Sequence, residues 1–232
     1  AYYTSEAIYQ QECAGLFIRT WQYVGHVSQA RNPGDYFSFE IGDQRLFCIR
    51  NSDNVLLTFY NVCQHRAHQL VEGQGHCKKA IVCPYHAWSY GLDGNLLRGP
   101  NTEVIPTEIR ERICLTPVRT QEFCGFFFVN LNDEAEPMET WFPQVEAQLR
   151  TFVPDIDQLK PVETILVNEK CNWKASVENY SECYHCRINH RTFATGVIKP
   201  DTYDIQPQGY CLRHTTECQN LEKMTYPIDL AP

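Results

Sequence analysis

The chain has 232 residues, of which 43% are hydrophobic and 21% are charged, and its formal net charge is −8. This balance is that of an ordinary globular protein with one large or two modest domains. No run of Lys or Arg stands out, which argues against nucleic acid as a partner. No signal peptide and no apolar stretch of membrane length is recognisable, so we expect no association with a membrane.

Cysteine is unusually frequent, with 12 residues, and a disulfide framework is one interpretation of such a count. The length of the chain and the metal-type motifs described below favour mostly free, buried thiols in a reducing cytoplasm instead. We expect the cysteines outside those motifs to be small core residues. They are Cys13, Cys48, Cys77, Cys114, Cys124, Cys171, Cys211 and Cys218.

The first part of the chain alternates short apolar stretches with turn residues, which is the pattern of β-strands. A short helix is predicted before them, over residues 4–13. The predicted strands cover 21–27, 36–41, 44–50, 55–62, 80–83, 88–90, 95–98, 115–122 and 125–131. The three strands between residues 36 and 62 should form a β-meander.

Two pairs of ligand-type residues follow predicted strands, Cys63-Gln-His65 and Cys83-Pro-Tyr-His86. Thiolates and imidazoles suit both iron–sulfur centres and zinc. Structural zinc sites mostly use pairs of like residues, spaced C-x2-4-C and H-x3-5-H. Here each pair mixes one Cys with one His, as a two-iron cluster needs when two Cys hold one iron and two His hold the other. The mixed pairs favour the cluster, and a structural zinc site of unusual spacing is the alternative.

These pairs, the second of which continues as His86-Ala-Trp88, resemble the cluster-binding loops of a Rieske [2Fe–2S] domain. The resemblance implies two loops at the tips of β-hairpins. Cys63 and Cys83 would bind the buried iron, and His65 and His86 would bind the outer iron.

Other histidine and aromatic residues near the two pairs are not expected to bind the cluster. His68 and His76 lie between the pairs, and the family pattern does not use them, so we expect solvent-exposed loop residues. Tyr85 and Trp88 flank His86. We expect them to shield the cluster, because burial tunes its potential.

The second part of the chain changes to helical patterning. An amphipathic helix is predicted over residues 137–152, and strands are predicted over 162–167, 203–205 and 210–216. Asn172 is a good N-cap for a helix that would carry Glu178, Glu182 and His185. We place the domain boundary before residue 156, which gives domains of residues 1–155 and 156–232.

Residues 171–190 contain the pattern Glu182-x2-His185-x4-His190. Glu182 and His185 are three apart and would share a face of a helix. Two His and one carboxylate leave open positions on a mononuclear Fe(II), which oxygen chemistry requires. Alone, this spacing fits a solvated helix face equally well. Behind a Rieske-type motif it indicates a second iron site.

Together the two stretches resemble the α subunits of Rieske-type non-haem iron oxygenases. The resemblance implies an α+β fold, with an N-terminal all-β Rieske domain followed by an α+β, helix-grip-like catalytic domain. His185 and His190 would be ligands of the mononuclear Fe(II). Glu182 would be the carboxylate that links His185 to His86 of the neighbouring subunit in a head-to-tail homotrimer. A partner reductase with flavin and NAD(P)H would supply the electrons.

The third iron ligand of this family is an Asp far downstream of the two His. Only Asp201, Asp204 and Asp229 follow His190. None has the family's sequence context, so the sequence identifies no third ligand. We therefore expect the catalytic domain to be incomplete at the C-terminal end of this sequence.

The segment Glu178-Asn-Tyr-Ser-Glu-Cys-Tyr-His-Cys186 resembles the branch of this family that acts on quaternary ammonium compounds. That branch includes oxygenases of glycine betaine, proline betaine (stachydrine), carnitine and choline. The implied reaction is oxidative N-demethylation, in which O2 hydroxylates one N-methyl group and the hemiaminal collapses to formaldehyde and a tertiary amine. Carnitine cleavage and choline oxidation are nearby variants. A Rieske oxygenase that hydroxylates aromatic rings and a non-catalytic electron carrier are the alternatives.

A quaternary ammonium group offers no hydrogen-bond donor and would need an aromatic cage. Tyr184, Phe193, Tyr203 and Tyr210 are the candidates, although each also fits a core position.

Overall fold

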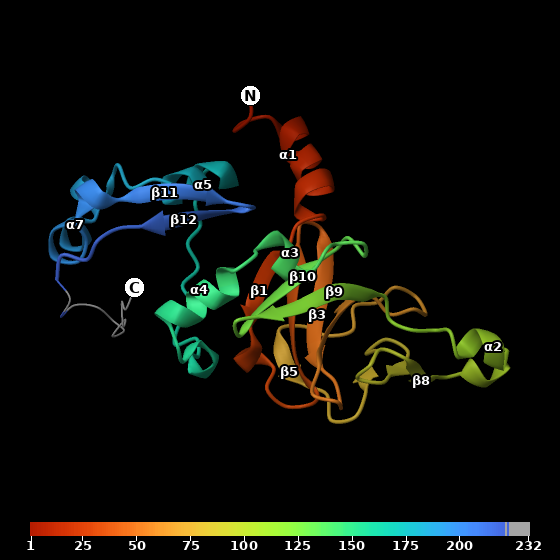
Figure 1. Ribbon diagram of the computed structural model, residues 1–232. Helices are drawn as coiled ribbons and strands as arrows, with labels where there is room; N and C mark the ends of the chain where they lie inside the picture. The colour runs from red at the N-terminus through yellow and green to blue at the C-terminus, as the bar shows by residue number, and fades with distance from the viewer. Residues whose placement is uncertain (221, 223–232) are drawn as a thin grey trace. The chain divides into compact units, whose positions relative to one another are not determined.

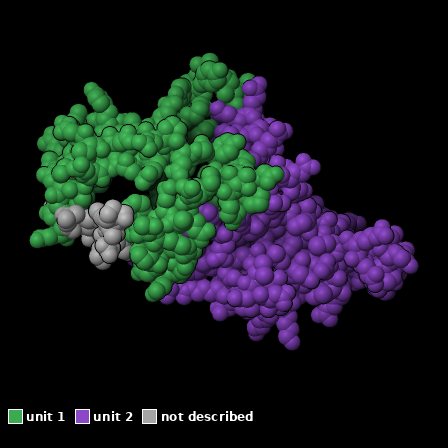
Figure 2. All heavy atoms as spheres, viewed as in Figure 1, with its two compact units in different colours: residues 1–9, 136–158, 163–232 green, residues 10–135, 159–162 purple. Residues whose placement is uncertain are grey.

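The structure, a computed structural model, describes residues 1–220 and 222. It divides into two compact units (Figure 1, Figure 2). We call Gln10–Ala135 with Leu159–Val162 the sheet unit. The helical unit is formed by Ala1–Tyr9, Glu136–Gln158 and the described residues of Glu163–Pro232. Helix α1 (Glu6–Glu12), expected over residues 4–13, contributes residues to both units. The domain boundary before residue 156 stays a prediction.

The sheet unit is built on a seven-stranded antiparallel sheet with the order β1-β10-β9-β4-β3-β2-β5. Its strands are β1 (Gln22–His26), β2 (Asp35–Ile41), β3 (Gln44–Arg50), β4 (Leu56–Tyr60), β5 (Gln74–His76), β9 (Pro117–Phe123) and β10 (Phe126–Asn130). A small sheet contains β6 (Ile81–Val82), β7 (Ser89–Tyr90) and β8 (Leu96–Arg98). Short helical turns are η1 (Cys13–Phe17), η2 (Val27–Gln29), η3 (Thr102–Val104) and α2 (Thr107–Arg110).

The predicted meander is confirmed, because β3 pairs with both β2 and β4. Phe47 on β3 lies opposite Phe59 on β4, and aromatic pairs of this kind stabilise neighbouring strands. Both side chains belong to a buried cluster that also contains Cys63, Cys83 and Tyr90. The main core of this unit therefore lies directly beneath the predicted ligand loops.

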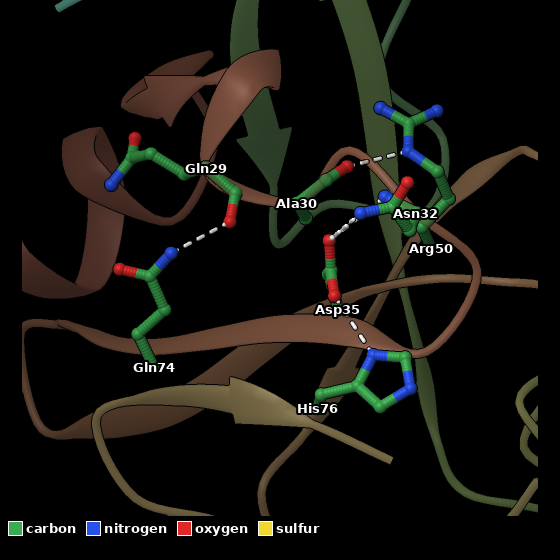
Figure 3. A network of polar contacts seen from close by, with 7 residues as sticks. All are labelled: Gln29, Ala30, Asn32, Asp35, Arg50, Gln74 and His76. Atoms are coloured by element: carbon green, nitrogen blue, oxygen red, sulfur yellow. Dashed lines mark hydrogen bonds and ion pairs between the residues drawn. The ribbon is translucent and has the colours of Figure 1, made fainter. Parts of the chain in front are cut away.

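Polar contacts join the loop before β2 to strands β3 and β5 (Figure 3). The Asp35 carboxylate accepts hydrogen bonds from the backbone N–H of Asn32 at 2.8 Å and from His76 Nδ1 at 2.8 Å. Burial opposes ionisation of Asp35, but these hydrogen bonds outweigh it and lower the pKa of the carboxyl. Arg50 is buried, and its Nε donates to the carbonyl of Ala30 at 2.5 Å. His76 is exposed as predicted, but it lies in strand β5 and not in a loop.

The helical unit contains short helices and one β-hairpin. Its elements are α3 (Met138–Trp141), α4 (Val145–Phe152), η4 (Ile156–Gln158), α5 (Trp173–Tyr180), α6 (Cys186–Asn189), α7 (Arg191–Gly196), η5 (Pro200–Thr202), β11 (Asp204–Gln208) and β12 (Cys211–Thr215). The hairpin confirms the two strands predicted after residue 202. The predicted N-cap is also confirmed, because the Asn172 side chain accepts a hydrogen bond from the backbone N–H of Lys174 at 3.1 Å.

The single helix predicted over residues 137–152 is wrong. The chain breaks between α3 and α4 at Pro143, and Gln144 adopts a φ of 66°. Proline has no backbone N–H and clashes with the preceding turn of a helix. The apolar spacing continues across this break, which is why the pattern alone suggested one helix.

The strand predicted over residues 162–167 is also wrong. Residues 161–169 form neither helix nor strand, and Val162 and Leu166 are 100% and 93% exposed. Alternating apolar residues form a strand only where a partner strand satisfies their backbone groups. The structure describes no such partner for this segment.

The cysteines differ from the expectation as well. Among the eight expected in the core, only Cys48 and Cys124 are buried, while Cys171 is exposed and the others are half-buried. Cys183 and Cys186, which are not among these eight, form a disulfide. Within residues 1–220 and 222, no helix has the length and apolar character needed to cross a membrane.

Candidate cluster and iron sites

The two predicted cluster loops have the same backbone structure. The N–H of Cys63 donates to the carbonyl of His68, and the N–H of Ala67 donates to that of Cys63. The second loop repeats this pattern, with bonds from Cys83 N to Trp88 O and from Ala87 N to Cys83 O. All four bonds measure 2.8–3.0 Å. Each loop is therefore a tight turn whose Cys is buried in the core, while His65 is exposed and His86 is half-buried.

Both turns contain an alanine in the left-handed region, with φ of 54° at Ala67 and 58° at Ala87. A side chain at such an angle costs roughly 1–2 kcal/mol per residue. Strain of this kind is retained where the surroundings hold the backbone in place, and it is frequent at functional sites.

The thiols of Cys63 and Cys83 form the inner half of the site. Both are only 2% exposed. Burial raises the pKa of the Cys63 thiol and the neighbouring Cys83 thiol adds to this, while the Tyr90 hydroxyl and the His65 backbone oppose it. The Tyr90 hydroxyl lies 3.2 Å from Cys63 Sγ and accepts a hydrogen bond from the Gln64 N–H at 3.0 Å. Its own proton is therefore available to the sulfur.

The imidazoles of His65 and His86 form the outer half, with ring centroids 4.8 Å apart. Trp88 is buried and stacks on His65 at 4.8 Å, with 8° between the planes. Tyr85 is exposed, and its ring lies 3.7 Å from that of His86. Desolvation and the nearby His65 and Arg66 lower the pKa of His86. Shielding of the cluster by Tyr85 and Trp88 stays a prediction, and of the two side chains only Trp88 is buried.

Gly99 allows Trp88 to occupy this position. A Cβ at residue 99 would lie 2.4 Å from Cδ1 of the Trp88 ring. The indole ring is rigid and cannot bend away from such a contact. A side chain at residue 99 would therefore push the whole ring out of its stacked position on His65.

These residues fit a Rieske-type cluster. Two adjacent buried thiols and two outer imidazoles match the division of ligands between the two irons of such a centre. Among residues 1–220 and 222, no three His, Cys, Asp or Glu side chains are grouped to hold a single metal ion. That finding is compatible with a centre in which each iron takes only two protein ligands.

The second candidate site is built on a loop, which corrects one prediction. Helix α5 ends at Tyr180, so Glu182 does not lie on a helix with Glu178. The hydroxyl of Ser181 donates to the carbonyl of Val177, as often happens near helix ends. Glu182 and His185 nevertheless meet, because Glu182 Oε1 lies 2.5 Å from His185 Nδ1.

The hydrogen bond between Glu182 and His185 fixes how the imidazole is presented. The pKa of the Glu182 carboxyl is lowered, chiefly because His185 donates a hydrogen bond to it. The backbone N–H of Tyr184 also donates to this carboxylate and lowers its pKa further. A carboxylate that accepts from Nδ1 leaves Nε2 free for a metal. The ring of His190 lies 5.1 Å from that of His185, and its side chain is exposed. The two imidazoles fit as a pair of ligands for one iron.

No third ligand was predicted, and the described part of the chain supplies none beside the two His. Asp201 forms an ion pair with Arg187, and Asp204 accepts a hydrogen bond from Gln206 at 2.7 Å. Asp229 lies outside the described residues.

A cavity of 250 Å³ adjoins Glu182 and His185. Phe193 and Tyr203, two of the predicted cage candidates, line it. The other two do not, since Tyr184 is almost fully exposed and Tyr210 packs on Trp141 with ring centroids 4.7 Å apart.

Two further residues of the cavity, Tyr180 and His214, were not predicted. The Tyr203 hydroxyl and His214 Nδ1 are 2.7 Å apart. Burial, followed by the nearby Tyr180 and Glu182, raises the pKa of Tyr203. His214 comes from strand β12, outside the motif, and no local spacing connects it to Glu182. Tyr180 lies inside the motif segment, two residues before Glu182. This closeness in sequence was the only indication that it could line the cavity.

Comparison with known proteins gives two family matches along the chain. Residues 20–108 match the Rieske [2Fe-2S] domain family, and residues 156–226 match the ring hydroxylating alpha subunit (catalytic domain) family. The carnitine monooxygenase oxygenase subunit of Escherichia coli K12 is 38% identical over 196 residues, which is 84% of this chain and 52% of that protein. The glycine betaine monooxygenase oxygenase subunit of Chromohalobacter salexigens is 29% identical over 204 residues, or 88% and 45% of the two proteins.

A solved structure is also similar. The quaternary ammonium Rieske monooxygenase CntA, in complex with its substrate L-carnitine, matches with a TM-score of 0.82 and 34% identity. The match covers 90% of this chain and 59% of that one. The chain spans about half the length of the curated relatives that it matches. The two domain matches show that this chain combines a Rieske [2Fe-2S] domain with a segment of the ring hydroxylating alpha subunit catalytic domain, the two parts found in the Rieske monooxygenases to which it is similar.

Proposed function

We propose that this chain belongs to the oxygenase component of a Rieske monooxygenase that acts on a quaternary ammonium compound. The observation that carries the proposal is the hydrogen-bonded pair Glu182–His185 beside His190, in a chain that also has the Cys63/His65/Cys83/His86 arrangement. A simple electron carrier would need only the second of these. The carnitine and glycine betaine oxygenases among the relatives support the class of substrate.

In this proposal Cys63, Cys83, His65 and His86 hold the [2Fe–2S] cluster, and His185 and His190 hold the mononuclear Fe(II). When bound, these groups supply one-electron transfer and activation of O2. Trp88 fixes the ring of His65, Tyr90 places a hydroxyl at the Cys63 sulfur, and Glu182 orients His185. The electrons come from a flavin-dependent reductase that oxidises NAD(P)H.

Glu182 has a second proposed role, as the bridge between subunits. In a head-to-tail homotrimer, which is a closed heterologous ring, the carboxylate would accept hydrogen bonds from His185 and from His86 of the neighbouring subunit. Its Oε1 already engages His185. Its lowered pKa keeps the carboxylate ionised and able to accept both bonds.

The proposed reaction is hydroxylation of a carbon atom bonded to the quaternary nitrogen. The resulting hemiaminal breaks its C–N bond, so that the carbon leaves as an aldehyde and the nitrogen leaves as a tertiary amine with loss of a proton. Attack on an N-methyl group releases formaldehyde. Attack on the larger substituent, the alternative suggested by the carnitine relatives, releases trimethylamine and a larger aldehyde.

The test is a turnover assay with protein loaded with cluster and iron, a flavin reductase and NADH. Glycine betaine, proline betaine, carnitine, choline and a set of aromatic acids are compared for formaldehyde, trimethylamine and O2 uptake. Formaldehyde from one amine supports demethylation, and trimethylamine supports the carnitine-type reaction. Turnover of aromatic acids alone would refute the proposed class of substrate and support the ring-hydroxylating alternative.

A further inference from the structure

The four residues Cys183-Tyr-His-Cys186 are closed by a disulfide between the two cysteines. The Cys186 N–H also donates to the carbonyl of Cys183 at 3.1 Å, so the crosslink spans a single turn. This turn carries His185 and follows Glu182 directly. Both cysteines line the same cavity as Glu182 and His185.

The two thiols that form this bond have different accessibility. Cys186 is 5% exposed, at the start of helix α6, whereas Cys183 is half-buried in the preceding loop. The thiol that reacts first with a dissolved reagent is the accessible one. The buried thiol, held within one turn of it, is then placed to resolve the product.

We propose that Cys183 and Cys186 form a thiol–disulfide modification site that couples thiol oxidation to the geometry of the iron site. The oxidant is a low-molecular-weight disulfide. The Cys183 thiolate attacks one sulfur of that disulfide, which forms a mixed disulfide and expels one thiolate. The Cys186 thiolate then attacks Cys183 Sγ, closes the intramolecular bond and expels the second thiolate. The two protein thiols lose two electrons and two protons, and the reagent is reduced to two thiols.

The closed form fixes the position of His185 relative to Glu182. The crosslink ties both ends of the turn 183–186, which carries His185 and directly follows Glu182. In the open form only the hydrogen bond between Glu182 and His185 and the backbone of the turn remain. Partners that orient a metal-ligating His typically change metal affinity by about 10–100-fold when they are lost. The closed form should therefore bind a divalent metal at His185 and His190 more tightly than the open form.

Formation of the bond does not depend on the proposed function, whereas its effect on metal binding rests on the proposed iron site. The first experiment tests the bond alone. Trypsin should cleave after Lys174 and Arg187 and release residues 175–187, whose only cysteines are Cys183 and Cys186. The cluster-loaded protein is equilibrated with glutathione buffers of varied ratio, alkylated and digested. We expect this peptide to carry two alkyl groups or none, with one two-electron transition. Two alkyl groups at every ratio, or mainly one, would overturn the proposal.

The second experiment measures coupling to the metal. Co²⁺ alone is titrated calorimetrically, in the absence of oxygen, into the oxidised and reduced forms of cluster-loaded protein freed of mononuclear iron. We expect the oxidised form to bind at least about tenfold more tightly. C183S/C186S should bind as the reduced form does, whatever the buffer. C171S removes an exposed cysteine that is free in the structure, and it should keep the wild-type response.

Equal affinity of the two forms for Co²⁺ would overturn the coupling. No binding of Co²⁺ in either form would instead refute the iron site and the coupling together, while the mass of peptide 175–187 would still report whether the disulfide forms. The failure of the modification site and the failure of the proposed function therefore give different results.

Discussion

Replacement of Tyr90 by Phe removes one hydroxyl beside Cys63, a proposed cluster ligand, and little else. The side chain is fully buried, and the oxygen lies 3.2 Å from Cys63 Sγ. The same oxygen already accepts the Gln64 N–H, so its proton is free to point at the sulfur. A reduced cluster carries one more negative charge than an oxidised one and accepts this hydrogen bond more strongly. Loss of the donor therefore destabilises the reduced state more, and the reduction potential should fall.

The magnitude follows from the hydrogen bond. A bond to a charged group contributes about 1.5–3 kcal/mol to stability, and only the difference between the two redox states shifts the potential. If that difference is about half of the bond, it amounts to roughly 1 kcal/mol. A tenfold change in equilibrium constant is 1.36 kcal/mol, or 59 mV for one electron. The expected decrease is thus roughly 40 mV, and about twice that if most of the bond energy is redox-dependent.

The assay is a redox titration of the cluster, followed by its visible circular dichroism. Tyr36→Phe is the matched control, because Tyr36 packs against the same core cluster while its hydroxyl faces Gly75. Y36F should leave the potential within about 10 mV of the wild type, which is under a fifth of a tenfold step. A potential that is unchanged or raised in Y90F would refute the reasoning. An equal decrease in both variants would attribute the effect to packing and not to the hydroxyl.

Three further predictions concern other parts of the chain. Arg50→Met removes bonds to the carbonyls of Ala30 and Asn54 and should lower the free energy of unfolding by roughly 2–4 kcal/mol. Arg45→Met, at an exposed ion pair, should cost about 0–1 kcal/mol, and equal thermal shifts for the two variants would contradict this. Glu182→Gln keeps an acceptor for His185 but removes the charge, so turnover should fall about 10–100-fold with iron content unchanged; loss of iron as well would indicate a structural role. Asp35 has a lowered carboxyl pKa, so its ionised form contributes stability that is present above the unfolded pKa of about 3.9 and is lost as the pH falls through the folded value. Urea unfolding of the metal-free protein should show the wild type more stable than D35N at pH 7, with the difference vanishing in acid; a difference that persists at pH 2 would show that ionisation is not its cause.

The sheet and the cluster motif could be predicted because their signals are local. The alternation of apolar residues and the turn residues indicate strands within a few positions of sequence. The mixed Cys/His pairs by themselves indicate a two-iron cluster with two kinds of ligand. The break at Pro143 was also visible in the sequence, but the apolar spacing on both sides hid it. The absence of a strand at residues 162–167 could not be predicted in the same way, because strand formation depends on a partner strand and not on the segment itself.

The candidate iron site shows a different limit of prediction. Glu182, His185 and His190 were identified by their spacing, and Glu182 and His185 were expected to share a helix face. Their actual arrangement comes from the end of α5 and a crosslinked turn. Residues that complete the cavity, such as His214, come from a hairpin distant in the chain. A spacing rule cannot include contacts of this kind, since they exist only after the chain has folded.

The two candidate sites also differ in how firmly their ligands are held. The Cys63 and Cys83 thiols are part of the main core, and their loops are held by duplicate backbone bonds and by the stacked Trp88. His185 is held by one carboxylate and one short turn, and His190 is exposed. A one-electron cluster benefits from firmly held, shielded ligands, because solvent access and hydrogen bonds to the sulfurs set its potential. An iron that must accept O2 needs open positions instead, and the control of such a site then passes to the groups just behind its ligands. In this chain the groups proposed for that role are Glu182 and the Cys183–Cys186 bond.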